Sequence, residues 1–245
     1  MYYFKKDNRV FVKKNRFKTQ VKLQTAFIVY LQGMEIKSIE YLISSPSVDL
    51  CPKDIKPEIA FIGRSNVGKS SLINMLSNKK EVAKVSSSPG KTQMINHYLV
   101  NKEMFWVDLP GYGFAKVAQS TRKTWTKMIW DYVEKRVQLM SLLVLIDSRH
   151  TPQKPDLEFI QKLGEKGIPF TLIFTKADKE SQKEVSGNVA KFKQALLKNW
   201  EALPPVFVSS AVKRLGRKEI LAFIDELKVQ TLQDIKEGLL PESKS

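Results

Sequence analysis

The sequence predicts a three-layer α/β fold, in which helices cover both faces of a mostly parallel six-stranded sheet with one antiparallel edge strand. Two observations predict it. Short, largely apolar segments rich in β-branched and aromatic residues alternate with segments whose apolar residues recur at helical spacing, and this alternation is typical of a doubly wound sheet. A glycine-rich turn also joins the first buried strand to a helix, as in other open α/β sheets.

Four segments are expected to form parallel strands buried on both faces, because they are short and largely apolar. They are EIAFI (58–62), SLLVLID (141–147), FTLIF (170–174) and PVFVSS (205–210). INHYLV (95–100) and EMFWVDL (103–109) flank a short polar Asn101-Lys102, which predicts a hairpin. This hairpin would add the antiparallel strand at the edge of the sheet.

Apolar residues recur every three or four positions in segments 121–138, 185–200 and 219–228, which predicts amphipathic helices. A further helix is expected to begin with SLINMLS, directly after the glycine-rich turn. The predicted core residues of the three helices are Trp125, Ile129, Tyr132, Val133, Val137, Val185, Val189, Phe192, Leu196, Trp200, Ile220, Phe223, Ile224 and Leu227. Their aromatic members are expected to fill the core and not to stack on nucleic acid.

Composition narrows the class of protein. No apolar run approaches the roughly 18 residues of a membrane span, and the single cysteine, Cys51, excludes an internal disulfide and a cysteine-rich zinc site. We therefore expect a cytoplasmic protein, and nothing in the sequence requires more than a monomer. The net charge of +16 favours a polyanionic partner such as RNA or an anionic membrane surface. Charge alone does not choose between them.

The chain is expected to divide into a basic extension (1–33), a central domain (34–231) and a flexible polar tail (232–245). The extension contains eight Lys or Arg and one acid, interleaved with aromatic residues, a pattern that suits RNA contact. Three explanations remain open: a start codon assigned upstream of Met34, an extension with a function, and a targeting segment. The serine enrichment typical of transit peptides is missing.

The segment GRSNVGKS (63–70) has the GxxxxGK[ST] pattern in its required place between a strand and a helix. Its glycines let backbone N–H groups surround a β-phosphate, and the helix N-terminus favours negative charge there. Lys69 would neutralise the β- and γ-phosphates, and the Ser70 hydroxyl would ligate Mg2+. This pattern predicts a P-loop NTPase without identifying the base.

Two later motifs predict that the base is guanine. TKAD (175–178) and SSA (209–211) follow successive predicted strands, at the sheet edge where ligands of this fold bind. The Asp178 carboxylate can accept hydrogen bonds from the ring N–H and the exocyclic amine of guanine, a donor pair that adenine lacks. The stem of Lys176 would cover the purine, and the N–H of Ala211 would meet the 6-oxo group. Thr175 stands where many GTPases have asparagine, whose side chain adds a bond between loops, so the match to this motif is slightly weaker.

The motif DLPG (108–111) closes the 103–109 strand. Asp108 would hold Mg2+ through a water molecule, and the N–H of Gly111 would sense the γ-phosphate. P-loop, DLPG, TKAD and SSA follow one another in the order of a GTPase with a Ras-like G domain. A turn without a ligand is the alternative for each short motif taken alone.

With SSPGKTQ, INHY, VDLPGYGFAKV and IDSRH, these motifs resemble the EngB (YihA/YsxC) family of bacterial GTPases in the Era-like group. The likeness runs from about Met34 to about Leu227, and DLPGYGFA with PGKTQ is its most specific part. It implies a cytoplasmic GTP switch in assembly of the large ribosomal subunit, needed for normal growth or division. The implied partners are ribosomal RNA and the large subunit or its precursors, not a membrane. It also implies that Thr92 ligates Mg2+ and senses the γ-phosphate.

The predicted nucleotide site gathers residues from all of these motifs. Its members are Gly63, Arg64, Ser65, Asn66, Val67, Gly68, Lys69, Ser70, Ser71, Gly90, Lys91, Thr92, Asp108, Leu109, Pro110, Gly111, Thr175, Lys176, Ala177, Asp178, Val208, Ser209, Ser210 and Ala211. The predicted metal ligands are Ser70, Thr92 and Asp108, and the predicted catalytic residues are Lys69, Asn66, Thr92 and Gly111.

Tyr112 occupies the position where Ras-like enzymes have a water-orienting glutamine. A phenol lacks the paired donor and acceptor of an amide, so intrinsic hydrolysis is expected to be slow. We expect Asn66 to help ligate K+ beside the β- and γ-phosphates, where the ion would add the charge that an arginine finger provides elsewhere. The alternative is that Asn66 is an ordinary polar loop residue.

Four basic residues, Lys116, Arg122, Lys123 and Lys127, lie in or just before the helix that follows Tyr112. Either GTP orders this segment and presents the charges to ribosomal RNA, or they form a solvated helix face. Two other functions also remain open at this point. These are an ATP-using P-loop enzyme such as a small kinase, and a nucleotide-independent RNA-binding protein with a decayed P-loop.

Overall fold

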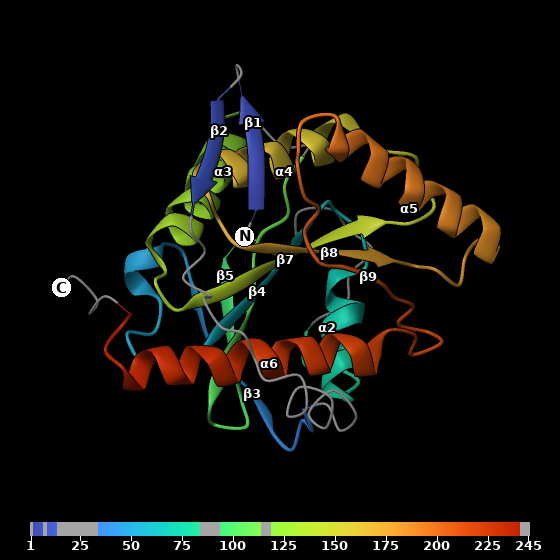
Figure 1. Ribbon diagram of the computed structural model, residues 1–245. Helices are drawn as coiled ribbons and strands as arrows, with labels where there is room; N and C mark the ends of the chain where they lie inside the picture. Colours follow the sequence, from blue (N-terminus) through green and yellow to red (C-terminus); the bar gives the residue numbers. More distant parts are fainter. Residues whose placement is uncertain (1, 7–8, 14–33, 84–93, 114–118, 241–245) are drawn as a thin grey trace.

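The structure is a computed structural model that describes residues 2–6, 9–13, 34–83, 94–113 and 119–240. A seven-stranded sheet, in the order β3-β5-β6-β4-β7-β8-β9, forms its centre (Figure 1). The strands are β3 (Ile39–Ser45), β4 (Glu58–Gly63), β5 (Ile95–Val100), β6 (Met104–Asp108), β7 (Leu139–Asp147), β8 (Phe170–Thr175) and β9 (Val206–Val208). A separate antiparallel hairpin consists of β1 (Tyr2–Lys6) and β2 (Arg9–Lys13).

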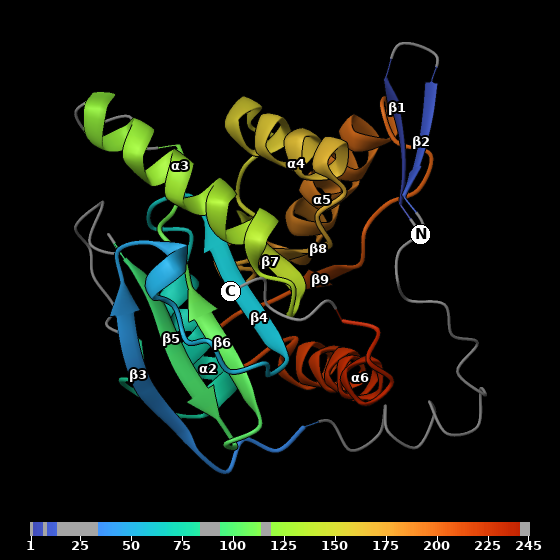
Figure 2. The same cartoon turned by 90° about the vertical axis from the view of Figure 1, so that its left-hand side faces the viewer.

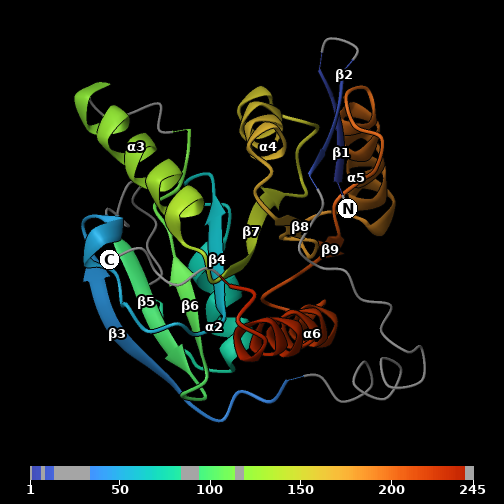
Figure 3. The same ribbon diagram turned by 60° about the vertical axis from the view of Figure 1, so that its left-hand side comes forward.

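Helices cover both faces of the sheet. One face carries α3 (Gln119–Lys135), α4 (Lys154–Lys166) and α5 (Gln182–Leu197), and the other carries α2 (Lys69–Ser77) and α6 (Arg217–Lys236) (Figure 2). A short 3-10 helix, η1 (Val48–Leu50), follows β3. Figure 3 shows the three layers edge-on, with α3, α4 and α5 above the strands and α2 and α6 below. The predicted three-layer α/β fold is confirmed.

Alternating side chains of the strands build one apolar core on each face. Ala60 and Ile62 of β4 pack toward the α3–α4–α5 side, whereas Ile59 and Phe61 pack toward α2 and α6. All four are fully buried, as expected of a central parallel strand covered on both faces. β4 therefore fixes the place at which its carboxyl end, Gly63, presents the glycine-rich turn.

The predicted number of strands is wrong, because β3 adds a seventh. It pairs antiparallel with β5 at the edge of the sheet, so the antiparallel strand of the predicted hairpin lies one place inside the edge. Tyr41, Leu42 and Ile43 are all exposed, and the register shifts between Tyr41 and Ile43. β3 thus lacks the alternation of apolar and polar residues that marks a half-buried strand.

The predicted hairpin between β5 and β6 is confirmed. Asn101 and Lys102 have φ values of 50° and 59°, the left-handed pair typical of a tight hairpin turn, and the Glu103 N–H donates to the Val100 carbonyl oxygen at 3.0 Å. Two helices differ from expectation. α4 was not predicted, and α6 continues to Lys236 with Asp234 buried, so residues 232–236 of the expected tail belong to a helix.

A buried charged cluster lies at the start of β4, at the opposite end of the strand from Gly63. Glu58 is fully buried, and its Oε2 accepts a hydrogen bond from Arg136 Nη2 at 2.6 Å. The Tyr132 hydroxyl donates to Oε1, and His97 Nε2 lies 3.6 Å from Oε2. Burial alone would raise the pKa of Glu58, but the contacts with His97 and Arg136 outweigh it and lower the pKa to about 2.

This cluster predicts acid sensitivity. Because the pKa of Glu58 is lower in the folded than in the unfolded chain, its stabilisation is present above the unfolded value of 4.5 and is lost as the pH falls toward about 2. The expected loss in the free energy of unfolding is about 3 kcal/mol. Denaturant unfolding across this pH range measures it. The free energy of unfolding of a Glu58→Gln variant should depend less steeply on pH. Equal losses in the variant and the wild type would show that Glu58 is not the source of the acid sensitivity.

Within the part of the chain that the structure describes, no helix has both the length and the apolar character needed to cross a membrane.

Candidate functional site

The glycine-rich turn runs from the end of β4 to the start of α2. Asn66 and Gly68 have φ values of 60° and 102°, so the backbone reverses there and points into the first turn of α2. A Cβ on Gly63 would lie 2.7 Å from Val67 Cγ1 and 2.9 Å from the Leu145 carbonyl oxygen, which explains why only glycine fits the strand end. The unpaired N–H groups at the start of α2 form an anion site of the kind that binds phosphate.

Lys69 and Asp108 meet beside this turn. Lys69 Nζ donates to Asp108 Oδ1, and their side chains are only 10% and 4% exposed. Asp108 ends β6, which lies next to β4 in the sheet. The structure therefore brings together the predicted phosphate-binding lysine and the predicted metal-binding carboxylate from positions 39 residues apart.

The residues around Asp108 fit a magnesium ion. The carboxylate of Asp108 already lies against a cation, the ammonium of Lys69, and Ser70 adds a hydroxyl oxygen in the first turn of α2. Mg2+ prefers such oxygen ligands and usually takes one or two carboxylates together with phosphates and water. Among the described residues no group of three or more His, Cys, Asp or Glu could hold a metal ion.

Thr175 makes the side-chain bond between loops that asparagine makes in many GTPases. Thr175 ends β8, and its Oγ1 lies 2.6 Å from the Val67 carbonyl oxygen in the phosphate turn and 3.2 Å from that of Ile146. The hydroxyl is buried, so a threonine donates the bond that we had expected only from an asparagine. The loop after β8 is thereby fixed to the phosphate turn.

Asp178 and the loop after β9 form the second half of the site. Ser210 Oγ donates to Asp178 Oδ1 at 2.6 Å, and this bond lowers the pKa of Asp178, which keeps the carboxylate ionised. The N–H of Ala177 donates to the Ser209 carbonyl oxygen at 3.1 Å. Gly216 closes the loop with φ 76°, and a Cβ there would lie 2.4 Å from the Val208 carbonyl oxygen.

Lys176 bridges the two halves. Its Nζ donates to the Asn66 carbonyl oxygen at 2.5 Å and to Asp147 Oδ2 at 2.9 Å. A Cβ on Gly68 would lie 3.9 Å from Lys176 Cε, so the lysine stem runs beside the phosphate turn. Sequence reasoning missed Asp147 as the partner of Lys176, although an acid at the end of a buried strand was a signal for it.

The side chain of Tyr112 packs against α4. Its hydroxyl donates to Asp156 Oδ1 on α4 at 2.9 Å, and its ring stacks on Phe159 at a centroid distance of 4.2 Å. Both Tyr112 and Asp156 are buried, and burial raises the pKa of each. Gly63 accepts a hydrogen bond from the Tyr112 N–H at 3.2 Å. Tyr112 is therefore a structural anchor for the segment after Gly111.

This geometry predicts that a Tyr112→Phe variant keeps its intrinsic hydrolysis rate within about twofold, because the phenol is not at the phosphates. The free energy of unfolding should fall by about 1–2 kcal/mol, since buried Asp156 loses a donor. Single-turnover hydrolysis and denaturant unfolding check the two parts. Tyr41→Phe, at an exposed tyrosine, is the matched control. A tenfold loss of rate at unchanged stability would contradict this role.

Several predicted residues lie elsewhere. Gly90, Lys91 and Thr92 fall outside the described residues, as does Lys116. The remaining predicted nucleotide-site residues lie at the ends of β4, β6, β8 and β9, in the four loops that follow these strands, and in the first turn of α2. Arg122, Lys123 and Lys127 are exposed on α3, but Lys127 pairs with Asp131 at 2.5 Å on the same helix.

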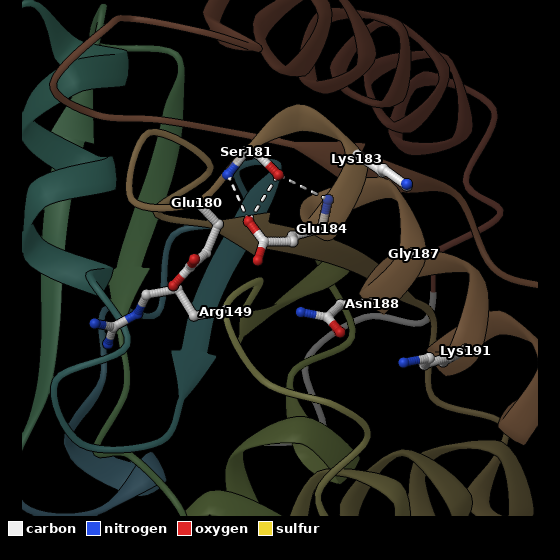
Figure 4. A pocket seen from close by; sticks show the side chains of 8 residues that line it. All are labelled: Arg149, Glu180, Ser181, Lys183, Glu184, Gly187, Asn188 and Lys191. Carbon is white, nitrogen blue, oxygen red and sulfur yellow. Dashed lines mark hydrogen bonds between the residues drawn. The ribbon is translucent and has the colours of Figure 1, made fainter.

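A hollow of about 630 Å3 lies beyond Arg149, against α5. Figure 4 shows its lining, with the Ser181–Glu184 capping pair at the start of α5 and Lys191 farther along the helix. None of the predicted nucleotide-binding residues lines it. The hollow is therefore not the site that the sequence motifs predict.

The loops at the carboxyl ends of β4, β6, β8 and β9 make this protein a P-loop GTPase with a Ras-like G domain. Comparison with known proteins agrees: residues 58–176 match the family model described as "50S ribosome-binding GTPase". The chain belongs to the EngB family of GTP-binding proteins. "Probable GTP-binding protein EngB" of Flavobacterium psychrophilum is 55% identical over 195 residues, covering 79% of this chain and 95% of that protein.

Two further matches agree. The protein of the same name from Porphyromonas gingivalis is 53% identical over 194 residues, covering 79% of this chain and 96% of that protein. A crystal structure of "a probable GTP-binding protein engB" superposes with a TM-score of 0.53 at 26% identity, covering 71% of this chain and 99% of that chain. Membership in a GTPase family removes both the ATP-using kinase and the nucleotide-independent protein as alternatives.

Proposed function

We propose that this protein is a slow GTP-driven switch that acts as a monomer in the cytoplasm, in assembly of the large ribosomal subunit, and is needed for normal growth or division. One observation carries the switch part of the proposal. Thr175 and Lys176 both donate to carbonyl oxygens of the phosphate turn, so the base loop and the phosphate loop respond to the nucleotide as one unit. The description of the family model as a 50S ribosome-binding GTPase supports the partner.

In this proposal each loop recognises one part of GTP. Asp178 accepts from the ring N–H and exocyclic amine of guanine, while Ala211 donates its N–H to the 6-oxo group. Lys69 and the N–H groups at the start of α2 hold the β- and γ-phosphates. The N–H of Gly111 meets the γ-phosphate, and the buried side chain of Tyr112 holds the neighbouring backbone in place.

Ser70 and Asp108 would hold Mg2+, Asp108 through a water molecule, with Thr92 as the third protein ligand. When bound, the ion neutralises charge that develops on the phosphates during hydrolysis. Lys69 must then exchange its contact with Asp108 for one with the phosphates. This exchange gives the free and loaded protein different arrangements of the same two side chains.

A potassium ion beside Asn66 is the proposed source of further positive charge in the transition state. Tyr112 is buried against α4, and no other described side chain takes the water-orienting place in our assignment. Hydrolysis rates measured in K+ and in Na+ buffer test the ion. Asn66→Ala should abolish the difference, and equal wild-type rates in the two buffers would remove K+ from the mechanism.

The proposed contact with ribosomal RNA uses Arg122 and Lys123, which are exposed near the start of α3. A protein that neutralises phosphates with such side chains binds RNA in a salt-dependent manner. The Arg122→Glu, Lys123→Glu double variant should bind large subunits more weakly, while its affinity for GDP stays unchanged.

The decisive experiment measures GTP hydrolysis with and without purified large ribosomal subunits in K+ buffer, with small subunits as the matched control. We expect stimulation by large subunits alone and tighter binding of the GTP-loaded than of the GDP-loaded protein. Equal rates with both subunits, or equal binding in both nucleotide states, would overturn the proposed ribosomal switch and leave the GTPase assignment intact.

A further inference from the structure

Asp147 is the last residue of β7 and lies opposite Thr175 in the neighbouring strand β8. The next residue of that loop, Lys176, therefore emerges beside it. Lys176 Nζ lies 2.9 Å from Asp147 Oδ2 and 2.5 Å from the Asn66 carbonyl oxygen. One ammonium thus joins the end of β7, the base loop and the phosphate turn.

The carboxylate of Asp147 is itself held from the other side. Arg149 Nε donates to Oδ1 at 2.9 Å, Nη2 donates to Oδ2 at 2.7 Å, and the Arg149 N–H donates to Oδ1 at 3.2 Å. This bidentate geometry fixes the plane of the carboxylate as well as its position. Arg149 also forms part of the lining of the hollow in Figure 4.

The environment keeps Asp147 charged. Burial alone would raise the pKa of Asp147, but hydrogen bonds from Arg149 and Lys176 outweigh it and hold the pKa well below its usual range. The Asp147 side chain is 13% exposed and that of Lys176 is 24% exposed. Lys176 also has a φ of 59°, a left-handed conformation that a lysine adopts only where the surroundings hold it.

We propose that Asp147 is a positioning residue for the guanine base: it holds Lys176 against the phosphate turn, so that the lysine stem forms one wall of the base site before the nucleotide arrives. This inference rests on the proposed role of Lys176 at the purine face. An unrestrained lysine would lose rotamer freedom on binding, and a side chain that is already held avoids that loss. Asp147 therefore contributes to nucleotide affinity without touching the nucleotide.

An Asp147→Asn variant tests this role. We expect the Kd for GDP and the Kd for GTP to rise by the same factor, about tenfold, because one partner of a charged hydrogen bond is lost. The KM for GTP should rise with it, whereas kcat at saturating GTP should stay unchanged, since the phosphates are held elsewhere. Selectivity for guanine over xanthine nucleotides should also stay unchanged.

The matched control is Asp225→Asn on α6. Asp225 Oδ1 lies 3.1 Å from Lys228 Nζ, and the two side chains are 21% and 13% exposed, so the chemical change and its setting are similar. Any loss of thermal stability in the free protein should be comparable in both variants. Only Asp147→Asn should weaken nucleotide binding.

A double-mutant cycle separates positioning from folding. If Asp147 acts through Lys176, the Asp147→Asn, Lys176→Ala double variant should bind GDP no more weakly than Lys176→Ala alone. Additive losses, or an unchanged Kd in Asp147→Asn, would overturn the inference. If Lys176→Ala itself leaves the Kd unchanged, the proposed base site is wrong, and this outcome is distinct from failure of Asp147 alone.

Discussion

Replacing Asp178 with asparagine is expected to lower the affinity for guanine nucleotides by at least about a hundredfold and to create a preference for xanthine nucleotides. Guanine offers two donors, its ring N–H and its exocyclic amine, and a carboxylate accepts both. An amide accepts only one of them and presents its own donor to the other. Xanthine carries a carbonyl oxygen in place of the amine, so the amide matches it.

The contact with Ser210 predicts how the amide of the variant is oriented. Ser210 Oγ donates to Asp178 Oδ1 at 2.6 Å, and in the variant the same hydroxyl would favour the orientation that keeps an oxygen there. The amide nitrogen then replaces Oδ2. Competition of GDP and xanthosine diphosphate against a fluorescent GDP analogue measures the preference.

Ser210→Ala is the control for this pair of residues. It removes the bond that orients Asp178 but leaves the carboxylate. The affinity for GDP and the discrimination against xanthine should therefore both fall, as in Asp178→Asn, but by much less. An Asp178→Asn protein that still prefers guanine over xanthine would show that another residue reads the base.

The buried parallel strands could be predicted from sequence because their side chains, apart from Asp147 at the end of β7, are apolar or enclosed. β4, β7 and β8 are covered on both faces, so their segments are apolar without alternation. β3 carries three exposed hydrophobic residues and a register shift at an edge, and this pattern resembles neither a half-buried strand nor a loop. Its place depends on pairing with β5, a contact that local sequence does not encode.

The phosphate and base residues could be predicted because their chemistry requires particular residue types at short spacing. Asp147 and Asp156 could not, since each acts through a partner distant in sequence. Asp147 pairs with Lys176, 29 residues away, and Asp156 receives the hydroxyl of Tyr112, 44 residues away. The contact of Thr175 could not be predicted from its residue type either. Its hydroxyl bonds to the phosphate turn because β8 ends beside that turn.

Replacing Lys69 with alanine is expected to reduce the affinity for both GTP and GDP by more than about a hundredfold, because the β- and γ-phosphates lose the ammonium proposed to neutralise them. The structure adds a second effect. Lys69 is the cation beside buried Asp108, so the variant leaves that carboxylate without its partner. The nucleotide-free protein should therefore lose about 3 kcal/mol of unfolding free energy or more. Titration with labelled GDP and denaturant unfolding measure the two effects separately, and Lys79→Ala, at an exposed lysine, is the control.

A double variant, Lys69→Ala with Asp108→Asn, separates the two roles of the lysine. Removing the carboxylate charge should recover most of the stability that Lys69→Ala loses, because no buried charge is then left unpaired. Nucleotide binding should not recover, since the phosphates still lack the ammonium. Recovery of both properties would mean that Lys69 serves mainly to neutralise Asp108, and recovery of neither would mean that the pair does not carry the stability assigned to it. We expect stability to recover without nucleotide binding, because the Lys69 ammonium pairs with Asp108 in the free protein and with the phosphates in the nucleotide-bound protein.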